Sequence, residues 1–247
     1  MFDPQEPLET PAETNGINTL NEKSLHAALK RWYAQPDDRF EARVDGFIID
    51  LVRGDLLVEI QTGSFSPLKR KLAVLSQNHP VRLVYPIAQE KWIVRLPKEE
   101  ATAAAKSTRR KSPLHGQVEH LFRELVYIPG LICNENFTLE VLLIREEEVR
   151  RFDSARAKAW RRKGWVIQER RLLEVVGRRI FNTPAELAGL LPALPEPFTV
   201  RQAGASVGQP DWLVRKMFYC LRAMGMIEAS GKRGRAVTYI RKQALLD

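Results

Sequence analysis

The sequence has few of the residues that form disulfide bonds or structural zinc sites. Its 247 residues include two cysteines and four histidines. Cys133 and Cys220 lie in separate apolar stretches, so we interpret them as buried thiols of a reducing compartment. His115 and His120 are five residues apart without a third ligand nearby, and a zinc site is therefore not expected.

Long apolar runs and several enzyme signatures are also missing. No run of about 18 apolar residues occurs, which predicts that the chain has no membrane span. Residues 1–21 are polar and lack the basic start and apolar centre of a signal peptide. The phosphate-binding loop of P-loop ATPases and the Gly-x-Ser-x-Gly motif are absent. We expect a cytoplasmic protein with a disordered arm over residues 1–20.

Positive charge is plentiful. Lysine and arginine number 39 against 30 acidic residues, a formal net charge of +9. This excess favours a polyanionic partner, although a solvated basic surface is the alternative. The length allows one large domain or two ordinary ones, and a hydrophobic content of 44% supports real cores.

The last third of the chain predicts a short helix, a turn, a longer helix and a basic hairpin. Thr183 and Pro184 are typical of a helix start. Residues 210–224 carry a broad apolar face, Gly225 ends the helix, and a Gly-rich basic turn joins strands at 226–230 and 236–241. Residues 183–242 resemble the winged helix-turn-helix family. The resemblance implies DNA contact through the second helix and the hairpin, by Arg215, Lys216, Lys232, Arg233 and Arg235; such modules also serve as protein-interaction domains.

The front of the chain predicts an α/β fold, with a mixed sheet flanked by helices. Helices are expected over 21–34 and 66–77, a hairpin over 42–51 and 56–61, and a strand over 81–85. Two acids, Asp45 and Glu59, stand in otherwise apolar strands. If the hairpin loop is the three residues 52–54, Asp45 and Glu59 share one face and Asp50 lies on the other; a two-residue turn would reverse this.

This order and these acids resemble the PD-(D/E)xK, or restriction-endonuclease-like, superfamily across residues 21–96. The resemblance implies that Asp45 and Glu59 bind Mg²⁺ or Mn²⁺, which activates a water for phosphodiester cleavage. The family's lysine position is Gln61 here, and glutamine supplies no positive charge. Lys69 or Lys71 on the following helix would substitute, and Lys69 is preferred because it is nearer the strand end.

The middle of the chain, residues 98–181, is less regular. We expect a strand at 91–96, a linker or exposed helix over 98–112, a helix over 113–127 and a strand over 138–145. A short basic helix over 154–163 and strands at 165–168 and 171–176 follow. We therefore divide the chain into a nuclease-like core at 21–97, a middle region at 98–181 that either links or completes that core, and a winged helix at 182–247.

The sequence thus predicts a metal-dependent DNA nuclease, active alone, as a homodimer or in a nucleoprotein complex. Two alternatives stay open. One is an inactive nuclease relative that regulates through DNA binding, and the other is a protein-interaction subunit of a nucleoprotein complex.

Overall fold

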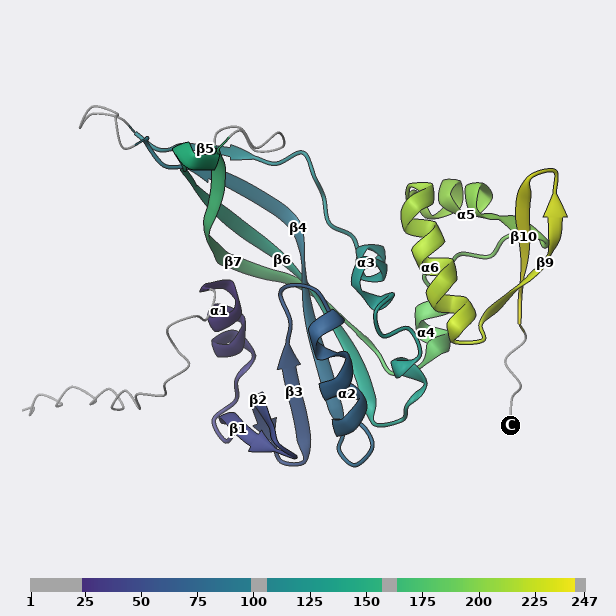
Figure 1. Cartoon of the computed structure of the whole chain (residues 1–247), viewed down its shortest axis with the longest axis horizontal. Helices are drawn as coiled ribbons and strands as arrows, with labels where there is room; N and C mark the ends of the chain where they lie inside the picture. The colour runs from purple at the N-terminus through teal and green to yellow at the C-terminus, as the bar shows by residue number, and fades with distance from the viewer. Residues whose placement is uncertain (1–23, 99–105, 157–163, 243–247) are drawn as a thin grey trace, which may run out of the picture.

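The structure is a computed structural model that describes residues 24–98, 106–156 and 164–242. A large mixed sheet is flanked by helices, and a smaller three-stranded sheet lies toward the C-terminus (Figure 1). This confirms the predicted α/β class with a mixed sheet between helices. In the described ranges, no helix is long and apolar enough to cross a membrane.

The chain begins with a helix and two successive hairpins. Helix α1 (Ser24–Tyr33) precedes β1 (Arg39–Val44), β2 (Phe47–Arg53) and β3 (Leu56–Ile60). The predicted single strand over 42–51 is wrong, because the chain reverses at residues 45–46. Asp45 has φ 49° and Gly46 has φ 81°, as a two-residue type I′ turn requires.

Three long strands, adjacent in the sheet order, form one side of the large sheet. The 3-10 turn Ser66–Leu68 leads into α2 (Lys69–Leu75), and then come β4 (Val81–Arg95), β6 (Phe137–Phe152) and β7 (Trp165–Phe181). The sheet order is β1-β2-β3-β4-β6-β7, with β4 parallel to both β3 and β6 and the other pairs antiparallel. The two strands predicted at 81–85 and 91–96 are one continuous strand, β4. The two predicted at 165–168 and 171–176 are likewise one strand, β7. Residues 98–181 therefore supply strands to the same sheet as residues 39–95.

One edge of β4 changes partner along its length. Its first part pairs with β3, up to Ile60 opposite Val84, and its last part pairs with β5 (Thr108–Lys111), starting at Trp92 opposite Lys111. Between these two pairings, this edge of β4 has no neighbouring strand. The segment predicted as a linker or exposed helix thus contains a strand, while its residues 99–105 lie outside the described ones.

Helices cover both faces of the large sheet. Leu25 and Leu29 of α1 pack with Val58 and Ile60 of β3. Leu72 of α2 packs with Leu57 of the same strand, which alternates with Val58 and Ile60, and with Leu83 of β4. Because successive strand residues point to opposite faces, α1 and α2 lie on opposite sides of the sheet. The predicted helix over 113–127 is shorter, consisting of a 3-10 turn at Val118–Leu121 and α3 (Phe122–Leu125), on the side of α2.

The C-terminal region keeps the predicted order of a short helix, a longer helix and a hairpin, and adds a short strand and a further helix that were not predicted. It contains α4 (Pro184–Ala188), β8 (Phe198–Thr199), α5 (Val200–Val207), α6 (Asp211–Ala223), β9 (Ile227–Arg233) and β10 (Ala236–Arg241). Thr183 caps α4 by accepting a hydrogen bond from the Glu186 N–H, as predicted. Short 3-10 turns occupy Leu131–Cys133 and Ser154–Arg156; the remainder of the predicted basic helix, 157–163, lies outside the described residues.

Candidate nuclease-like site and basic C-terminal surface

The β2–β3 hairpin places two acidic residues opposite each other on neighbouring strands. Arg53 pairs with Leu56 and Leu51 with Val58, so the loop has two residues and Asp50 stands opposite Glu59. The Ile60 N–H donates to Asp50 Oδ2 at 2.9 Å, and the Asp50 N–H donates to Glu59 Oε1 at 3.3 Å. Each carboxylate is therefore oriented by the backbone of the other strand.

Asp45 is not part of this pair, which corrects the sequence prediction. It lies in the turn between β1 and β2, where its carboxylate contacts His79 at 2.9 Å (Oδ2 to Nε2). The three-residue loop assumed for the hairpin is wrong, and the two-residue turn reverses which acid meets Glu59. Asp50, the rejected candidate, takes the position that was assigned to Asp45.

A lysine from α2 completes the cluster. Lys71 Nζ donates to Glu59 Oε1 and to the Ile48 carbonyl. Its side chain is 15% exposed and that of Glu59 only 6%, so this ion pair is largely shielded from water. Lys71, rather than the preferred Lys69, is therefore the lysine that reaches the carboxylates. Gln61 follows at the end of β3 and donates to the Ser64 carbonyl at 2.7 Å.

Helix α1 contributes two residues that the sequence did not single out. His26 Nε2 lies 3.1 Å from Asp50 Oδ2, and Lys30 Nζ lies 3.9 Å from Asp50 Oδ1. Residues four apart share a face of a helix, so the spacing of His26 and Lys30 was a usable signal. It was missed because Asp50 had been assigned to the wrong face of the hairpin.

The two carboxylates have opposite pKa shifts. Burial, and then the charge of Asp50, raise the pKa of Glu59 to about 7, despite the opposing charge of Lys71. Burial acts on Asp50 in the same direction, but the hydrogen bond and charge of His26, with the Ile60 N–H, hold the pKa of Asp50 below its ordinary value. The pair thus carries one firmly ionised acid and one that changes charge near neutral pH.

Asp50 and Glu59 suit a divalent cation. Mg²⁺ usually takes one or two carboxylates and completes its shell with water and phosphate oxygens. Burial and the charge of Asp50 raise the pKa of Glu59, and a bound cation would favour its ionised form. Among the described residues, no group of three or more His, Cys, Asp or Glu side chains could hold a metal, so Asp50 and Glu59 could supply at most two protein ligands.

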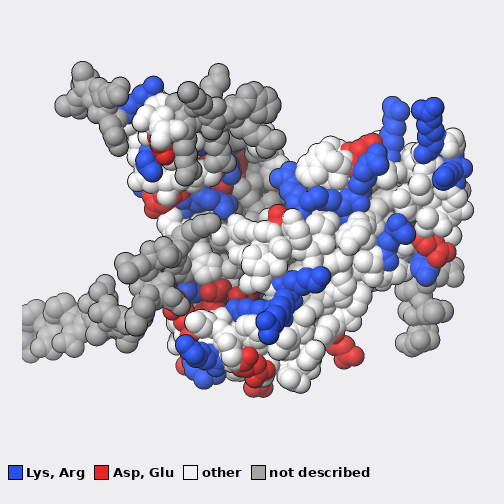
Figure 2. Space-filling view, in the orientation of Figure 1, with Lys and Arg blue, Asp and Glu red and all other residues white. Residues whose placement is uncertain are grey.

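A second candidate surface is formed by the C-terminal helices and hairpin. Helix α6 buries Leu213, Val214, Met217 and Phe218 and leaves Arg215 exposed. Lys216 is half-buried and donates to the Arg123 carbonyl at 2.9 Å, so it faces α3 as well as solvent. On the face shown in Figure 2, lysine and arginine side chains gather over α3, α5 and α6 and again at the β9–β10 tip.

The basic hairpin tip is exposed, as its composition suggested. Lys232 and Arg233 lie at the end of β9 rather than in the turn, and Arg235 follows Gly234 in the turn itself. Arg233 Nη2 donates to the Pro197 carbonyl at 3.2 Å. Arg235 lines a hollow of about 340 Å³ together with Arg201 and Arg215, which brings three arginines from α5, α6 and the hairpin to one place.

The C-terminal helices also contact the large sheet's own helices. The Arg123 guanidinium lies 5.0 Å from the centre of the Trp212 ring, and Gln209 donates to Gln117. Apolar side chains of α3 and α6 belong to one continuous hydrophobic core. The exposed basic surface is therefore held firmly against the half of the molecule that carries Asp50 and Glu59.

Comparison with known proteins places the chain in a family. It is 32% identical over 228 residues to an "Uncharacterized protein" of Treponema pallidum (strain Nichols), an alignment that covers 90% of this chain and 86% of the relative. No solved structure matches. A family model described as "Domain of unknown function (DUF8091)" matches residues 23–182, which contain the whole of the large sheet. The chain belongs to the DUF8091 family.

Proposed function

We propose that the protein binds DNA and cleaves its phosphodiester bonds with the help of Mg²⁺ or Mn²⁺. The observation that carries this proposal is the meeting of Asp50, Glu59 and Lys71, which come from β2, β3 and α2. Two acids and a shielded lysine at one hairpin end are costly to bury together. A chemical role for them explains their placement better than stability does.

The order of elements supports the same proposal. Helix α1, strands β1 to β3, helix α2 and strand β4 follow one another, with the acids on β2 and β3. This is the order on which the sequence resemblance to the PD-(D/E)xK superfamily rests, with Asp50 in place of Asp45. Lys71 supplies from α2 the positive charge that Gln61 lacks.

Each residue has a definite part in the proposed chemistry. Asp50 and Glu59 would hold the divalent cation, which when bound lowers the pKa of a water and polarises the phosphate. Glu59 must be ionised to act, and its pKa of about 7 allows this near neutral pH. His26 and the Ile60 N–H fix the orientation of Asp50. Lys71 places a positive charge where the phosphate gains negative charge.

The C-terminal region is proposed to act as a winged helix that binds DNA. Two helices followed by a hairpin, with Arg215 on α6 and Lys232 and Arg235 near the tip, present cations in the places where such modules meet phosphates. Arg201, on α5, adds to the set that the sequence predicted. Binding of this kind falls steeply as the salt concentration rises.

A second function, DNA binding without cleavage, is favoured by one specific observation. Both candidate metal ligands already have cationic partners: Glu59 pairs with Lys71, and Asp50 contacts His26 and Lys30. A site neutralised in this way can persist in a protein that only binds DNA. The two functions differ in whether a divalent cation produces cleavage.

The test is to incubate the protein with single- and double-stranded DNA in Mg²⁺ or Mn²⁺. Asp50→Asn and Glu59→Gln should each lower the cleavage rate by at least about 100-fold, since each removes a ligand charge. Asp45→Asn is the matched control, because it makes the same change in the neighbouring hairpin, and it should retain the wild-type rate. Salt-dependent binding with no cleavage under any condition would favour the second function; cleavage retained in Asp50→Asn and Glu59→Gln would reject the site.

A further inference from the structure

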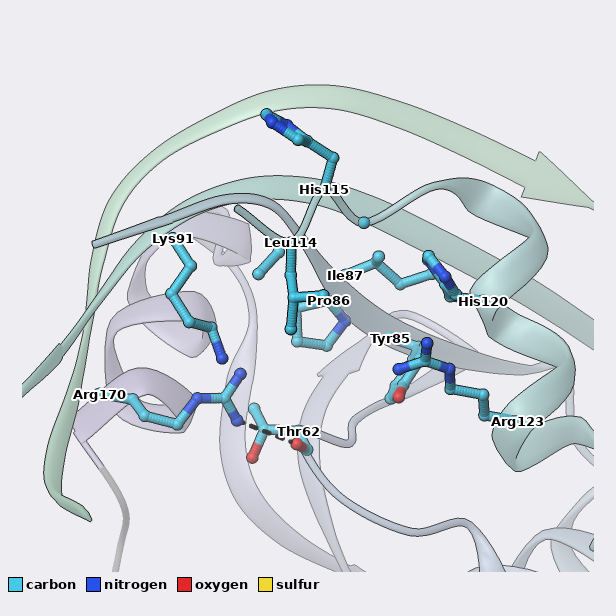
Figure 3. A pocket seen from close by; sticks show the side chains of 12 residues that line it. Thr62, Tyr85, Pro86, Ile87, Lys91, Leu114, His115, His120, Arg123 and Arg170 are labelled. Carbon is cyan, nitrogen blue, oxygen red and sulfur yellow. Dashed lines mark hydrogen bonds between the residues drawn. The ribbon is translucent and has the colours of Figure 1, made fainter. Parts of the chain in front are cut away.

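The gap along the edge of β4 opens into a pocket. It lies between the end of β3 and the end of β5, and residues 112–116 run along it: the Ser112 N–H donates to Lys91 O at 2.7 Å, and the Gly116 N–H to Ala88 O at 2.9 Å. We call this space, of about 240 Å³, the notch pocket (Figure 3). Gly116 must be glycine there, because a Cβ would stand 2.2 Å from Ala88 O.

Three cationic side chains line the notch pocket. Lys91 and Arg170 enter from one side, and Arg123 lies on the other side beside Tyr85 and His120, whereas the His115 ring points away (Figure 3). They come from β4, β7 and α3, which are far apart in sequence. Such convergence of cations on one hollow is typical of an anion-binding site.

A fully buried carboxylate fixes two of these cations. Glu146 on β6 accepts from Arg170 Nη2 at 2.6 Å through Oε2, and its Oε1 lies 2.8 Å from Lys91 Nζ. Arg170 Nη1 also donates to the Thr62 carbonyl at 3.2 Å. The Lys91 and Arg170 side chains are therefore held in place before any ligand arrives, which lowers the entropy cost of binding.

The charged residues that line the notch pocket are all basic. Lys91 also pairs with Glu148 at 3.2 Å, and Glu148 pairs in turn with Arg150. Three cations, Lys91, Arg123 and Arg170, are among the residues that line the notch pocket, and none of those lining residues is acidic. This positive lining suits a phosphate group.

The remaining walls suit a sugar and a base. Tyr85, Pro86, Ile87 and Leu114 supply flat or apolar surface, and the Tyr85 ring is held edge-on by Phe65 at 4.9 Å between ring centres. Aromatic and apolar faces of this kind stack on unpaired bases. A space of about 240 Å³ admits one nucleotide. It is too small for a double helix, whose major groove alone is about 12 Å wide.

The notch pocket begins beside the candidate metal site. Thr62, which lines it, is three residues after Glu59, and the Gln61 N–H donates to Val84 O, next to Tyr85. A strand with one phosphate at Asp50 and Glu59 would present its next nucleotide to Tyr85, Arg123 and Arg170.

We propose that the notch pocket binds one phosphate-bearing nucleotide of a single DNA strand, next to the phosphodiester that meets Asp50 and Glu59. The inference rests on the proposed function and adds to it a preference for unpaired DNA at the site of cleavage. Double-stranded DNA is held by the C-terminal surface instead, and it enters the notch pocket only where its strands separate.

The test measures binding in EDTA, where no cleavage occurs. The probe is a fluorescent eight-nucleotide single strand followed by anisotropy, with a duplex of the same sequence as a comparison. Arg123→Gln and Lys91→Gln should each weaken single-strand binding about 10- to 100-fold, and duplex binding much less. Arg145→Gln is the matched control: it removes one charge from β6 outside the notch pocket, where Arg145 pairs with Glu90 and Glu174.

Several outcomes decide the inference. The inference is overturned if Arg123→Gln and Lys91→Gln bind the single strand as tightly as Arg145→Gln does. It is also overturned if these two variants lose duplex binding as strongly as single-strand binding. If Lys91→Gln fails to fold because Glu146 loses a partner, Arg123→Gln still decides. If a deoxynucleoside 5′-monophosphate displaces the single strand from the wild-type protein, the notch pocket holds the end of a strand. If it does not, while Arg123→Gln still loses single-strand affinity as expected, the notch pocket holds an internal nucleotide. Because binding is scored without metal, absence of cleavage in Mg²⁺ would count against the proposed function alone.

Discussion

The two halves of the molecule use charge in opposite ways. In the large sheet, Asp50, Glu59 and Lys71 are mostly shielded from water, and Glu59 contacts both Lys71 and the Asp50 N–H. In the C-terminal region, Arg215, Lys232 and Arg235 stand at the surface. Both halves come from a chain with the same basic excess, so composition alone does not distinguish them.

The difference separates what each half responds to. Ionisable groups that are shielded from water perturb one another's pKa values strongly, and their behaviour depends on pH and on geometry. Exposed cations act mainly through the ionic atmosphere and depend on salt. We therefore expect changes to the large sheet to alter chemistry, and changes to the C-terminal hairpin to alter affinity.

The largest expected effect is on the cleavage rate. It tests whether the position of a positive charge on α2 matters, or only its presence. Lys71→Met should lower the cleavage rate about 100- to 1,000-fold, because it removes the positive charge beside Glu59. Lys69→Met removes the same charge from the same helix and should retain most of the rate. The measurement is the initial rate of cleavage in Mg²⁺; equal losses in both variants would contradict the assignment.

The next effect concerns the proton held by Glu59. Its pKa of about 7 lies above the ordinary carboxyl value of 4.5. Between these pH values the folded state holds a proton that the unfolded state has released, so this group makes the free energy of unfolding fall as pH rises from about 4.5 to 7. A carboxyl-carbon NMR titration should place the Glu59 midpoint near 7.

Asp50→Asn is the informative variant in that titration. It removes a charge that raises the pKa of Glu59, so the midpoint should move to lower pH. A wild-type midpoint near 4.5, or one that Asp50→Asn leaves in place, would show that the two acids are not coupled.

A smaller effect is expected at the C-terminal hairpin. Replacing Lys232 and Arg235 by alanine should weaken duplex binding about tenfold at moderate salt and reduce the slope of log affinity against log salt by about 2. Arg39 and Arg43, exposed on β1, provide a control double variant with the same loss of charge. If both double variants lower the slope equally, binding reflects net charge and the hairpin has no special part.

The smallest effect concerns the contact between the two halves. Trp212→Ala removes the ring that stacks on Arg123 and should lower the free energy of unfolding by about 1 kcal/mol. Tyr219 is the matched control, since it is also a half-exposed aromatic residue of α6 (56% against 47%). Urea unfolding followed by fluorescence measures both, and a larger loss in Tyr219→Ala would place the important contact elsewhere.

The sequence predicted α1, α2, α4 and α6 better than it predicted the hairpins at the front of the chain, whereas it missed α5 and made the helix over 113–127 too long. Thr183 and Pro184 have a local mechanism, capping, which acts whatever the rest of the chain does. The strand over 42–51 was missed as a hairpin because its apolar residues alternate on both sides of the turn. Asp45-Gly46 is a favoured type I′ pair, and giving that local signal priority would have placed Asp45 in a turn rather than in a strand.

The candidate site was predicted in kind but not in its members. Glu59 was identified because an acid in an apolar strand is unusual, and that signal is local. Its partner depends on the loop length between β2 and β3, and a one-residue error moves every side chain to the other face. The choice of Lys71 over Lys69 depends on how α2 packs on the sheet, which no local pattern encodes. The notch pocket joins residues of β4, β7 and α3 and gave no signal in the sequence.

Pro86 gains a meaning from the gap along β4. The carbonyls of Val84 and Ala88 accept hydrogen bonds from Gln61 and Gly116 on the open side of the strand. Residues two apart direct their backbone groups to the same side, so Pro86 would present its N–H to the gap, and as proline it has none to present. An unpaired strand edge is a template for association between chains, and proline is one way that proteins protect it. The gap can therefore stay open to a ligand without inviting a strand of another molecule to fill it.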